Sequence, residues 1–131
     1  MTMEKKYKLL EDDTVSVNGR TLYRIEALRD FADVKKGDKG GYVEKEENLS
    51  HDDNCWVYGN ARVYDNAQVY GDAWVGGDAW VYENARVYGN AWVCGNAQVY
   101  GDARVYGDAQ LYENARVFGN AQVYGDARVY D

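Results

Sequence analysis

Few side chains in this 131-residue chain could do chemistry. His51 is the only histidine, and Cys55 and Cys94 are the only cysteines. Acyl transfer needs a general base with a pKa near neutrality, which histidine supplies most readily. One imidazole is too few for a three-histidine zinc site, and Cys94 has no neighbouring histidine or lysine to lower its thiol pKa. We therefore predict no catalytic residue, no metal site and no cofactor.

Asn and Asp recur at regular intervals, as in the evenly spaced column Asp72, Asn90, Asp108 and Asp126. Stacked carboxylates could bind Ca²⁺. Asn, however, occupies eight of the thirteen equivalent positions, which a divalent cation would not favour. Asn and Asp also tolerate left-handed backbone conformations better than other side chains do, so a structural role at corners is the better interpretation.

The elements that hold these residues are short repeats. From Asp53 to Tyr130 the chain divides into thirteen hexapeptides with the consensus G-[ND]-A-x-V-Y. Alternation along A-x-V-Y predicts a short strand with Ala and Val buried and with x and Tyr exposed. The G-[ND] pair predicts a sharp corner. Identical units running the same way form parallel ladders between coils, so the sequence predicts a parallel β-helix.

The spacing of the tryptophans predicts the number of sides per coil. Trp56, Trp74 and Trp92 recur at every third hexapeptide, and Asp65 and Glu83 are separated by the same interval. A coil of three hexapeptides explains both intervals, so we expect a triangular prism of four to five coils. The three indoles should then lie one above another on one face.

These residues resemble a known family. The pattern V-Y-G-D-A-R is similar, over residues 53–130, to the hexapeptide repeat of left-handed parallel β-helix proteins with the LpxA-like fold, which usually have a smaller residue in place of Tyr. The stretch "DFADVKKGDKGGYVEKEENLSHDDNCWVY" resembles the start of bacterial and prophage YdcK-like proteins. The resemblance implies a left-handed helix, trimerisation along the faces, and an acyltransferase activity that uses a histidine base.

Two domains are expected. Residues 1–46 do not follow the repeat, and Asn18-Gly19 between two alternating runs predicts a β-hairpin that caps the helix, followed by a Gly-rich lead-in. Residues 47–131 form the β-helix. In its first unit, "ENLSHD", the frame puts Leu49 in the Ala position and His51 in the Val position, under the cap. Cys55 replaces Ala and is expected to be buried.

Charge and hydropathy limit the partners. The chain has 22 acidic and 15 basic residues, so it would repel a phosphate backbone, and we predict no direct nucleic-acid binding. The sequence has no apolar run near the roughly 20 residues of a membrane helix and no signal-peptide pattern. We expect a soluble cytoplasmic protein, in the host cytoplasm if it is phage-encoded.

The outward aromatic residues are the strongest functional signal. Most outward Tyr side chains are expected to form stabilising ladders. On the tryptophan face, Gly76 and Cys94 replace Tyr and open a shelf beside the indoles. Exposed apolar strips of this kind mark interfaces, unless residues 20–46 fold back over the face. The predicted partner-binding residues are Trp56, Trp74, Trp92, Trp80, Gly76, Cys94 and Tyr112.

The last coil should be a second interface. Residues 113–130 would present unpaired strand edges and core side chains, and such edges template further pairing. We expect a homo-oligomer through an end-to-end contact, with a trimer along the faces as the alternative. The predicted interface residues are Val117, Phe118, Val123, Tyr124, Val129 and Tyr130.

Together these features favour a non-enzymatic β-solenoid of phage or prophage type that self-associates and binds a protein partner. Three alternatives stay open. Residues 53–131 carry ten acids against five arginines, so the rod could mimic a nucleic acid and inhibit a host or defence enzyme. Acyl transfer would follow the family resemblance, although the repeats contain no histidine. The aromatic faces could also bind sugars.

Overall fold

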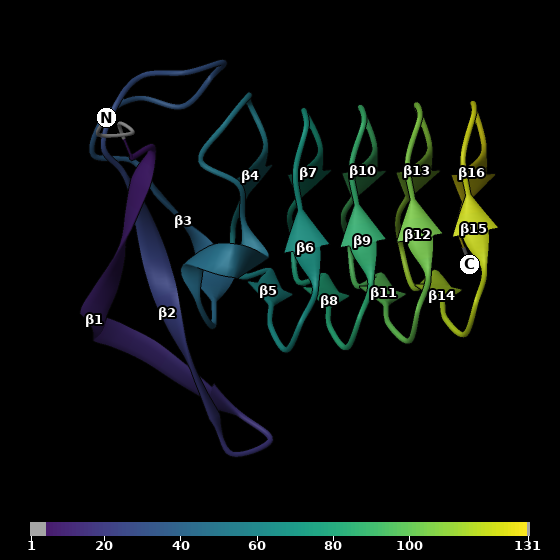
Figure 1. Cartoon of the computed structure of the whole chain (residues 1–131), viewed down its shortest axis with the longest axis horizontal. Helices are drawn as coiled ribbons and strands as arrows, with labels where there is room; N and C mark the ends of the chain where they lie inside the picture. The colour runs from purple at the N-terminus through teal and green to yellow at the C-terminus, as the bar shows by residue number, and fades with distance from the viewer. Residues whose placement is uncertain (1–4, 131) are drawn as a thin grey trace.

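The computed structural model describes residues 5–130 and is an all-β solenoid with a hairpin at one end (Figure 1). The chain begins with β1 (Tyr7–Val17), β2 (Arg20–Ala27), β3 (Lys39–Val43) and the 3₁₀ helix η1 (Glu46–Asn48). No helix in the described part of the chain is long and apolar enough to span a membrane. Two-residue strands follow: β4 (Trp56–Val57), β5 (Arg62–Val63), β6 (Gln68–Val69), β7 (Trp74–Val75), β8 (Trp80–Val81), β9 (Arg86–Val87), β10 (Trp92–Val93), β11 (Gln98–Val99), β12 (Arg104–Val105), β13 (Gln110–Leu111), β14 (Arg116–Val117), β15 (Gln122–Val123) and β16 (Arg128–Val129).

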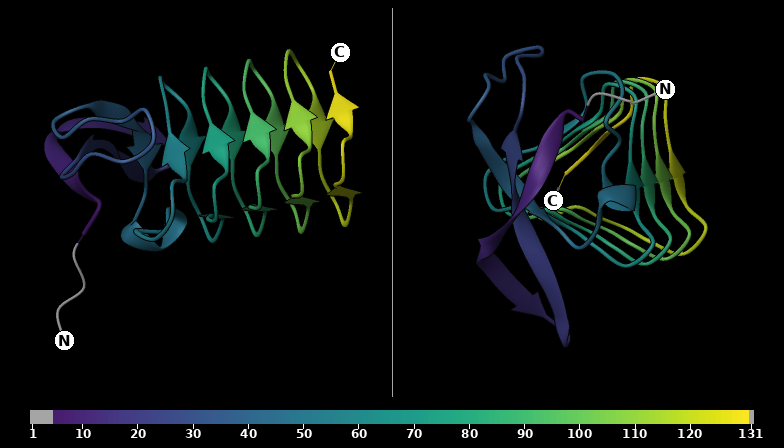
Figure 2. Two further views of the ribbon diagram at one scale, coloured as in Figure 1. Left: turned by 90° about the horizontal axis from the view of Figure 1, so that it is seen from above. Right: turned by 60° about the vertical axis from the view of Figure 1, so that its left-hand side comes forward.

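The short strands stack into three parallel sheets, which confirms the predicted β-helix of three-sided coils. One sheet has the order β16-β13-β10-β7-β4, and another has the order β15-β12-β9-β6. The third joins the hairpin to the rod in the order β1-β2-β3-β5-β8-β11-β14. Each strand from β4 to β13 pairs with the strand three hexapeptides further on, as Val63 does with Val81. Figure 2 shows the coils nearly in superposition, with the hairpin across one end.

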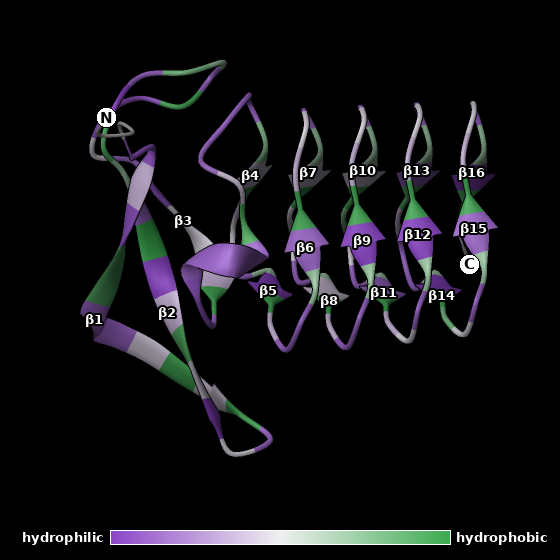
Figure 3. Ribbon diagram, viewed as in Figure 1, coloured by the Kyte–Doolittle hydropathy of each residue, from purple (hydrophilic) through white to green (hydrophobic). Residues whose placement is uncertain are grey.

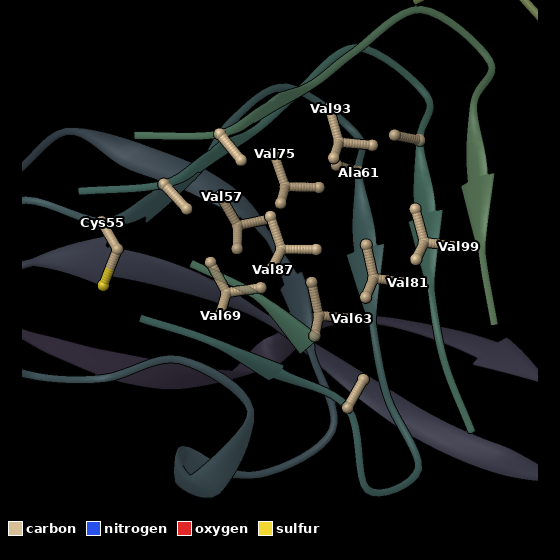
Figure 4. Packing of buried hydrophobic residues seen from close by; sticks show 14 of the residues in the cluster. Cys55, Val57, Ala61, Val63, Val69, Val75, Val81, Val87, Val93 and Val99 are labelled. Carbon is tan, nitrogen blue, oxygen red and sulfur yellow. The ribbon is translucent and has the colours of Figure 1, made fainter. Parts of the chain in front are cut away.

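The core is a column of Ala and Val along the axis, as the alternation predicts. Ala and Val of the repeats are almost all fully buried from Ala61 to Ala109, and Leu111 takes one Val position. Figure 3 shows the alternation of hydropathy along the coils, and Figure 4 shows valines from successive coils pointing toward one another. The repeat therefore buries the same two small side chains on every side of every coil.

The corners have left-handed backbone conformations. Gly101 has a φ of 69°, and Asp65 and Glu83 adopt φ values of 58° and 57° at equivalent corners. The two carboxylates also bind the next coil, since the Glu83 N–H donates to Asp65 Oδ2 at 3.1 Å and the Gly101 N–H donates to Glu83 Oε1 at 2.9 Å. A carboxylate at these corners thus links two coils and compensates for the cost of a left-handed residue other than glycine.

The hairpin turns at Asn18 and Gly19, with φ values of 51° and 79°, as predicted from this pair. Its strand β2 pairs antiparallel with β3, and β3 pairs parallel with β5 through Tyr42↔Arg62 and Val43↔Val63. The first coil of the solenoid therefore starts at β3, inside the range that we assigned to the cap. The cap contributes Tyr7, Ile25 and other buried side chains to the same core as the repeats.

The predicted frame of the first coil was wrong by two residues. Leu49 bridges Val69, an offset of 20, whereas Trp56 pairs with Trp74 at the usual offset of 18. Leu49 therefore fills a Val position rather than an Ala position, and it is fully buried. The corner after Leu49 is longer by two residues, and His51 lies in that corner rather than in the core.

The enlarged corner receives a buried lysine that the sequence did not reveal. Lys6 is fully buried, and its Nζ donates to the carbonyl oxygens of Cys55 at 2.6 Å, Asp53 at 3.3 Å and Asp52 at 3.4 Å. Cys55 is buried, as predicted, and its Sγ lies 3.4 Å from the same ammonium. Burial lowers the pKa of Lys6, and its interactions with Cys55 partly oppose this. The lysine satisfies carbonyl groups that would otherwise lack partners at the end of the rod.

Candidate protein-binding surface

The indoles of Trp56, Trp74 and Trp92 lie one above another on the β4-β7-β10 sheet, as predicted. Trp56 pairs with Trp74, and Trp74 pairs with Trp92, in register. Their exposure increases along the column: Trp56 is 1% exposed, Trp74 is half-buried and Trp92 is 47% exposed. The exposed part of the column therefore consists of Trp74 and Trp92.

Trp56 does not belong to an exposed strip, contrary to the prediction, because the cap covers it. The ring of Phe31 meets its indole edge-on at 5.2 Å, with an interplanar angle of 71°. Tyr7 contacts it from another side at 6.1 Å. The segment 20–46 thus folds back over the tryptophan face at its first coil, while Trp92 stays exposed.

A hollow of about 230 Å³ lies beside the exposed indoles. The rings of Trp74 and Trp92 stack there, with their centroids 5.4 Å apart and an interplanar angle of 5°. On its other side Trp74 contacts Tyr58 at 4.8 Å. Gly76 and Cys94 provide the floor where Tyr stands in most other repeats. The hollow is almost entirely apolar, and its lining residues are Tyr58, Trp74, Gly76, Trp92, Val93 and Cys94.

Two groups in the wall of the hollow are held in their neutral forms. Burial raises the pKa of the Cys94 thiol, whose Sγ lies 3.4 Å from the Leu111 carbonyl oxygen. Burial, and secondly the negative charge of Asp33, raise the pKa of Tyr58 to about 12. The Tyr58 hydroxyl is buried and has no hydrogen-bond partner among the described residues. The sequence analysis missed Tyr58, although its position, one coil before Gly76 in the same column, is a usable signal.

Acidic side chains flank the strand that carries Trp74. Asp72 and Asp78 occupy the corners before and after β7, and both are exposed. The equivalent corner positions around β10 are Asn90 and Asn96, which carry no charge. The exposed indoles are therefore an apolar surface with negative charge on either side of Trp74.

Trp80 and Tyr112, which were also predicted to bind the partner, lie outside this surface. Trp80 belongs to the β8 face, where it is half-buried near the hairpin and contacts Tyr64 at 6.2 Å and the Arg62 guanidinium at 5.3 Å. Tyr112 stacks on Tyr130 at 4.8 Å and does not line the hollow. Both tyrosine ladders on the other two faces are present, as in the pairs Tyr64 with Tyr82 and Tyr70 with Tyr88.

The last coil exposes three aromatic rings. Phe118, Tyr124 and Tyr130 are 56%, 58% and 61% exposed. Val123 and Val129 are half-buried, whereas Val117 is 5% exposed. The N–H of Tyr100 donates to the Val117 carbonyl oxygen at 3.0 Å, but the equivalent N–H one coil later, that of Phe118, has no backbone acceptor among residues 5–130.

His51, the one candidate base, is held by the cap. Its Nδ1 accepts the Lys6 N–H at 3.0 Å, its Nε2 lies 2.8 Å from Glu46 Oε1, and its ring stacks on Tyr7 at 4.1 Å. The hydrogen bond from His51 is the main cause that lowers the pKa of Glu46. Within residues 5–130 no group of three or more His, Cys, Asp or Glu side chains could hold a metal ion.

Comparison with known proteins gives a match for the repeats. A family model described as "YdcK Beta solenoid repeat" matches residues 57–71, 67–83, 79–95, 97–113, 109–122 and 121–131. These six matches together cover more than half of the chain. No curated protein matches the chain.

Proposed function

The chain belongs to the YdcK β-solenoid repeat family, and we propose that it is a non-enzymatic binding protein with two interfaces. Trp74 and Trp92 bind a protein partner, and the last coil binds a second copy of the chain. The observation that carries the proposal is the stacked, half-exposed pair of indoles beside an apolar hollow.

The size and lining of the hollow favour a protein side chain as its occupant. Its volume of about 230 Å³ is below the roughly 300 Å³ at which small-molecule sites begin. Large exposed aromatic residues are unusual on a protein surface, and tryptophan is enriched among the residues that dominate binding energy at interfaces. An occupant of one side chain, with further contacts on the sheet around it, fits this surface.

The surroundings of the candidate nucleophile and base support a non-enzymatic role. Both ring nitrogens of His51 already have partners in the cap and in Glu46, so neither is free to take a proton from a substrate. The raised thiol pKa of Cys94 keeps it protonated near neutral pH, and a protonated thiol is a poor nucleophile.

Trp92→Ala is expected to weaken binding of the partner at least tenfold, because truncation of a central aromatic contact costs about 2 kcal/mol or more. The partner can be isolated on the immobilised chain, identified by mass spectrometry and titrated by calorimetry. Gln110→Ala is the matched control, because Gln110 follows Trp92 in the same column one coil later. Binding that Trp92→Ala and Trp74→Ala both leave intact would remove the indoles from the interface.

Self-association is expected through the last coil. Two copies related by a twofold axis perpendicular to the rod would place their last coils edge to edge, with antiparallel strands that satisfy donors such as the Phe118 N–H. Sedimentation should give twice the mass of one chain, and Val123→Lys should give one chain. Tyr88→Lys, in a ladder on a side face, should leave the dimer intact. If Tyr88→Lys dissociates the dimer and Val123→Lys leaves it intact, the copies associate along the side faces.

A further inference from the structure

The chain itself shows which side chain the tryptophan column accepts. At the first coil, the column is occupied by Phe31, whose ring meets the Trp56 indole edge-on at 5.2 Å. Phe31 is presented by a tight turn closed by two hydrogen bonds, in which the Phe31 N–H donates to the Val34 carbonyl at 2.9 Å and the Val34 N–H donates to the Phe31 carbonyl at 2.7 Å. The turn delivers one aromatic ring to one indole.

The solenoid repeats the same indole two more times in register, at Trp74 and Trp92. At these coils the position of Phe31 has no equivalent within residues 5–130, and the hollow lies in front of Gly76 and Cys94. From this, and resting on the proposed function of the two indoles, we infer that the partner inserts one aromatic side chain, carried on a tight turn, into the hollow beside Trp74 and Trp92.

The walls of the hollow favour a ring over an aliphatic chain. They are formed mainly by aromatic groups, namely Tyr58, Trp74 and Trp92. Edge-to-face and offset contacts between aromatic rings add to the gain from burial alone. An apolar ring also brings no polar atom of its own into this lining, whereas a charged side chain would be desolvated without a partner.

Charge on either side of Trp74 adds a second requirement. Asp72 and Asp78 lie exposed at the two corners that flank β7. The turn that carries Phe31 is itself followed by Lys35 and Lys36, both exposed. A partner turn with a basic residue next to its aromatic residue would therefore complement these two carboxylates, and this part of the recognition should weaken in salt.

The test uses disulfide-cyclised peptides displayed on phage, selected on the full chain and counter-selected on the Trp92→Ala variant. A second probe is a cyclic peptide of the sequence "RDFADVKK", which copies the Phe31 turn, with its Phe→Ala form as the matched control. We expect selected peptides to share one aromatic position, whose replacement by Ala weakens binding at least tenfold. Asp72→Asn with Asp78→Asn should weaken binding a few-fold for peptides with basic flanks.

The outcomes separate this inference from the proposed function. Selected peptides that depend on Trp92 but use an aliphatic or charged anchor would overturn the aromatic occupant and keep the binding surface. Binding of the copied turn and of its Phe→Ala form with equal affinity would also overturn it. If no selected peptide distinguishes the native chain from Trp92→Ala, both the inference and the proposed surface are wrong.

Discussion

Gly41→Ala is expected to lower the free energy of unfolding by about 3 kcal/mol, the upper part of the range for overpacking a buried site. A Cβ on Gly41 would lie 2.6 Å from the Ala61 carbonyl oxygen and 2.7 Å from Val57 Cγ1. The oxygen cannot move away freely, because it accepts the Tyr42 N–H at 2.9 Å in the ladder that joins β3 to β5. The substitution therefore weakens the contact between β3, where the first coil starts, and β5 in the next coil.

Gly76→Ala is the matched control for this measurement. The Cβ on Gly76 would have only Tyr58 Cβ close by, at 3.3 Å, and the position is on the outer surface of the solenoid. We expect its stability to change by no more than about 0.5 kcal/mol. Urea unfolding of the two variants and of the parent chain measures both changes in the free energy of unfolding, if the three curves share one dependence on urea concentration. Equal stability of the two variants would mean that the cap does not depend on close contact at β3.

The repeats could be predicted from the sequence because every unit carries the same information. Val81 and Ala79 are buried for the same reason as their counterparts in other coils, and the recurrence of Trp74 and Trp92 at every third unit fixes the number of sides. An irregular residue in one unit leaves the pattern of the others intact. The hairpin turn at Asn18-Gly19 was also predictable, since this pair adopts the required φ values locally.

The first coil was not predictable in this way, because its determinants are not repeated. The two extra residues in the corner after Leu49 have no counterpart in later coils, so the regular frame placed His51 in a core position that Leu49 occupies. The buried position of Lys6 depends on carbonyl groups 46 or more positions away, and no local pattern marks it. Non-repeating segments are where tertiary contacts override a periodic signal.

The candidate surface could be predicted in part for the same reason. The column of three indoles follows from periodicity, but the burial of Trp56 follows from Phe31, which belongs to the cap and lies outside the repeats. The contact between Phe31 and Trp56 also bears on why the column continues with Trp74 and Trp92 beyond the first coil. If the outer indoles served only to stabilise the coils, a ring such as Tyr would fill positions 76 and 94, as it does in most other repeats.

Between pH 10 and pH 12 the chain is expected to lose several kcal/mol of stability, because buried tyrosines that keep their protons in the folded chain each contribute about 1.4 kcal/mol per pH unit. Tyr7 and Tyr64 are 0% and 1% exposed, and burial is the main cause that raises the pKa of each above its ordinary value of 10.0. The folded chain therefore keeps these protons after the unfolded chain has lost them. The contribution of these tyrosines to stability is complete below pH 10, and it decreases as the pH rises toward their pKa in the folded chain.

Other buried groups do not reverse this trend. The pKa of Cys55 is raised from 9.0 and that of Lys6 is lowered from 10.5, in both cases mainly by burial. The Cys55 shift makes stability decrease above pH 9, whereas the Lys6 shift makes stability increase with pH until 10.5, so the two oppose each other where their ranges overlap. Above pH 10.5 the tyrosines therefore dominate the slope.

Phenylalanine substitutions at the two tyrosines should separate their contributions. The Tyr64 hydroxyl is buried without a hydrogen-bond partner among the described residues, so Tyr64→Phe should raise stability at pH 7 by about 1 kcal/mol and reduce the alkaline slope by about 1.4 kcal/mol per pH unit. The Tyr7 hydroxyl donates to the carbonyl oxygens of Glu46 and Leu49, so Tyr7→Phe should lower stability at pH 7 while it reduces the slope by the same amount. Urea unfolding from pH 7 to 12 measures both effects. An unchanged alkaline slope in Tyr64→Phe would show that this ring ionises as freely in the folded chain as in the unfolded one.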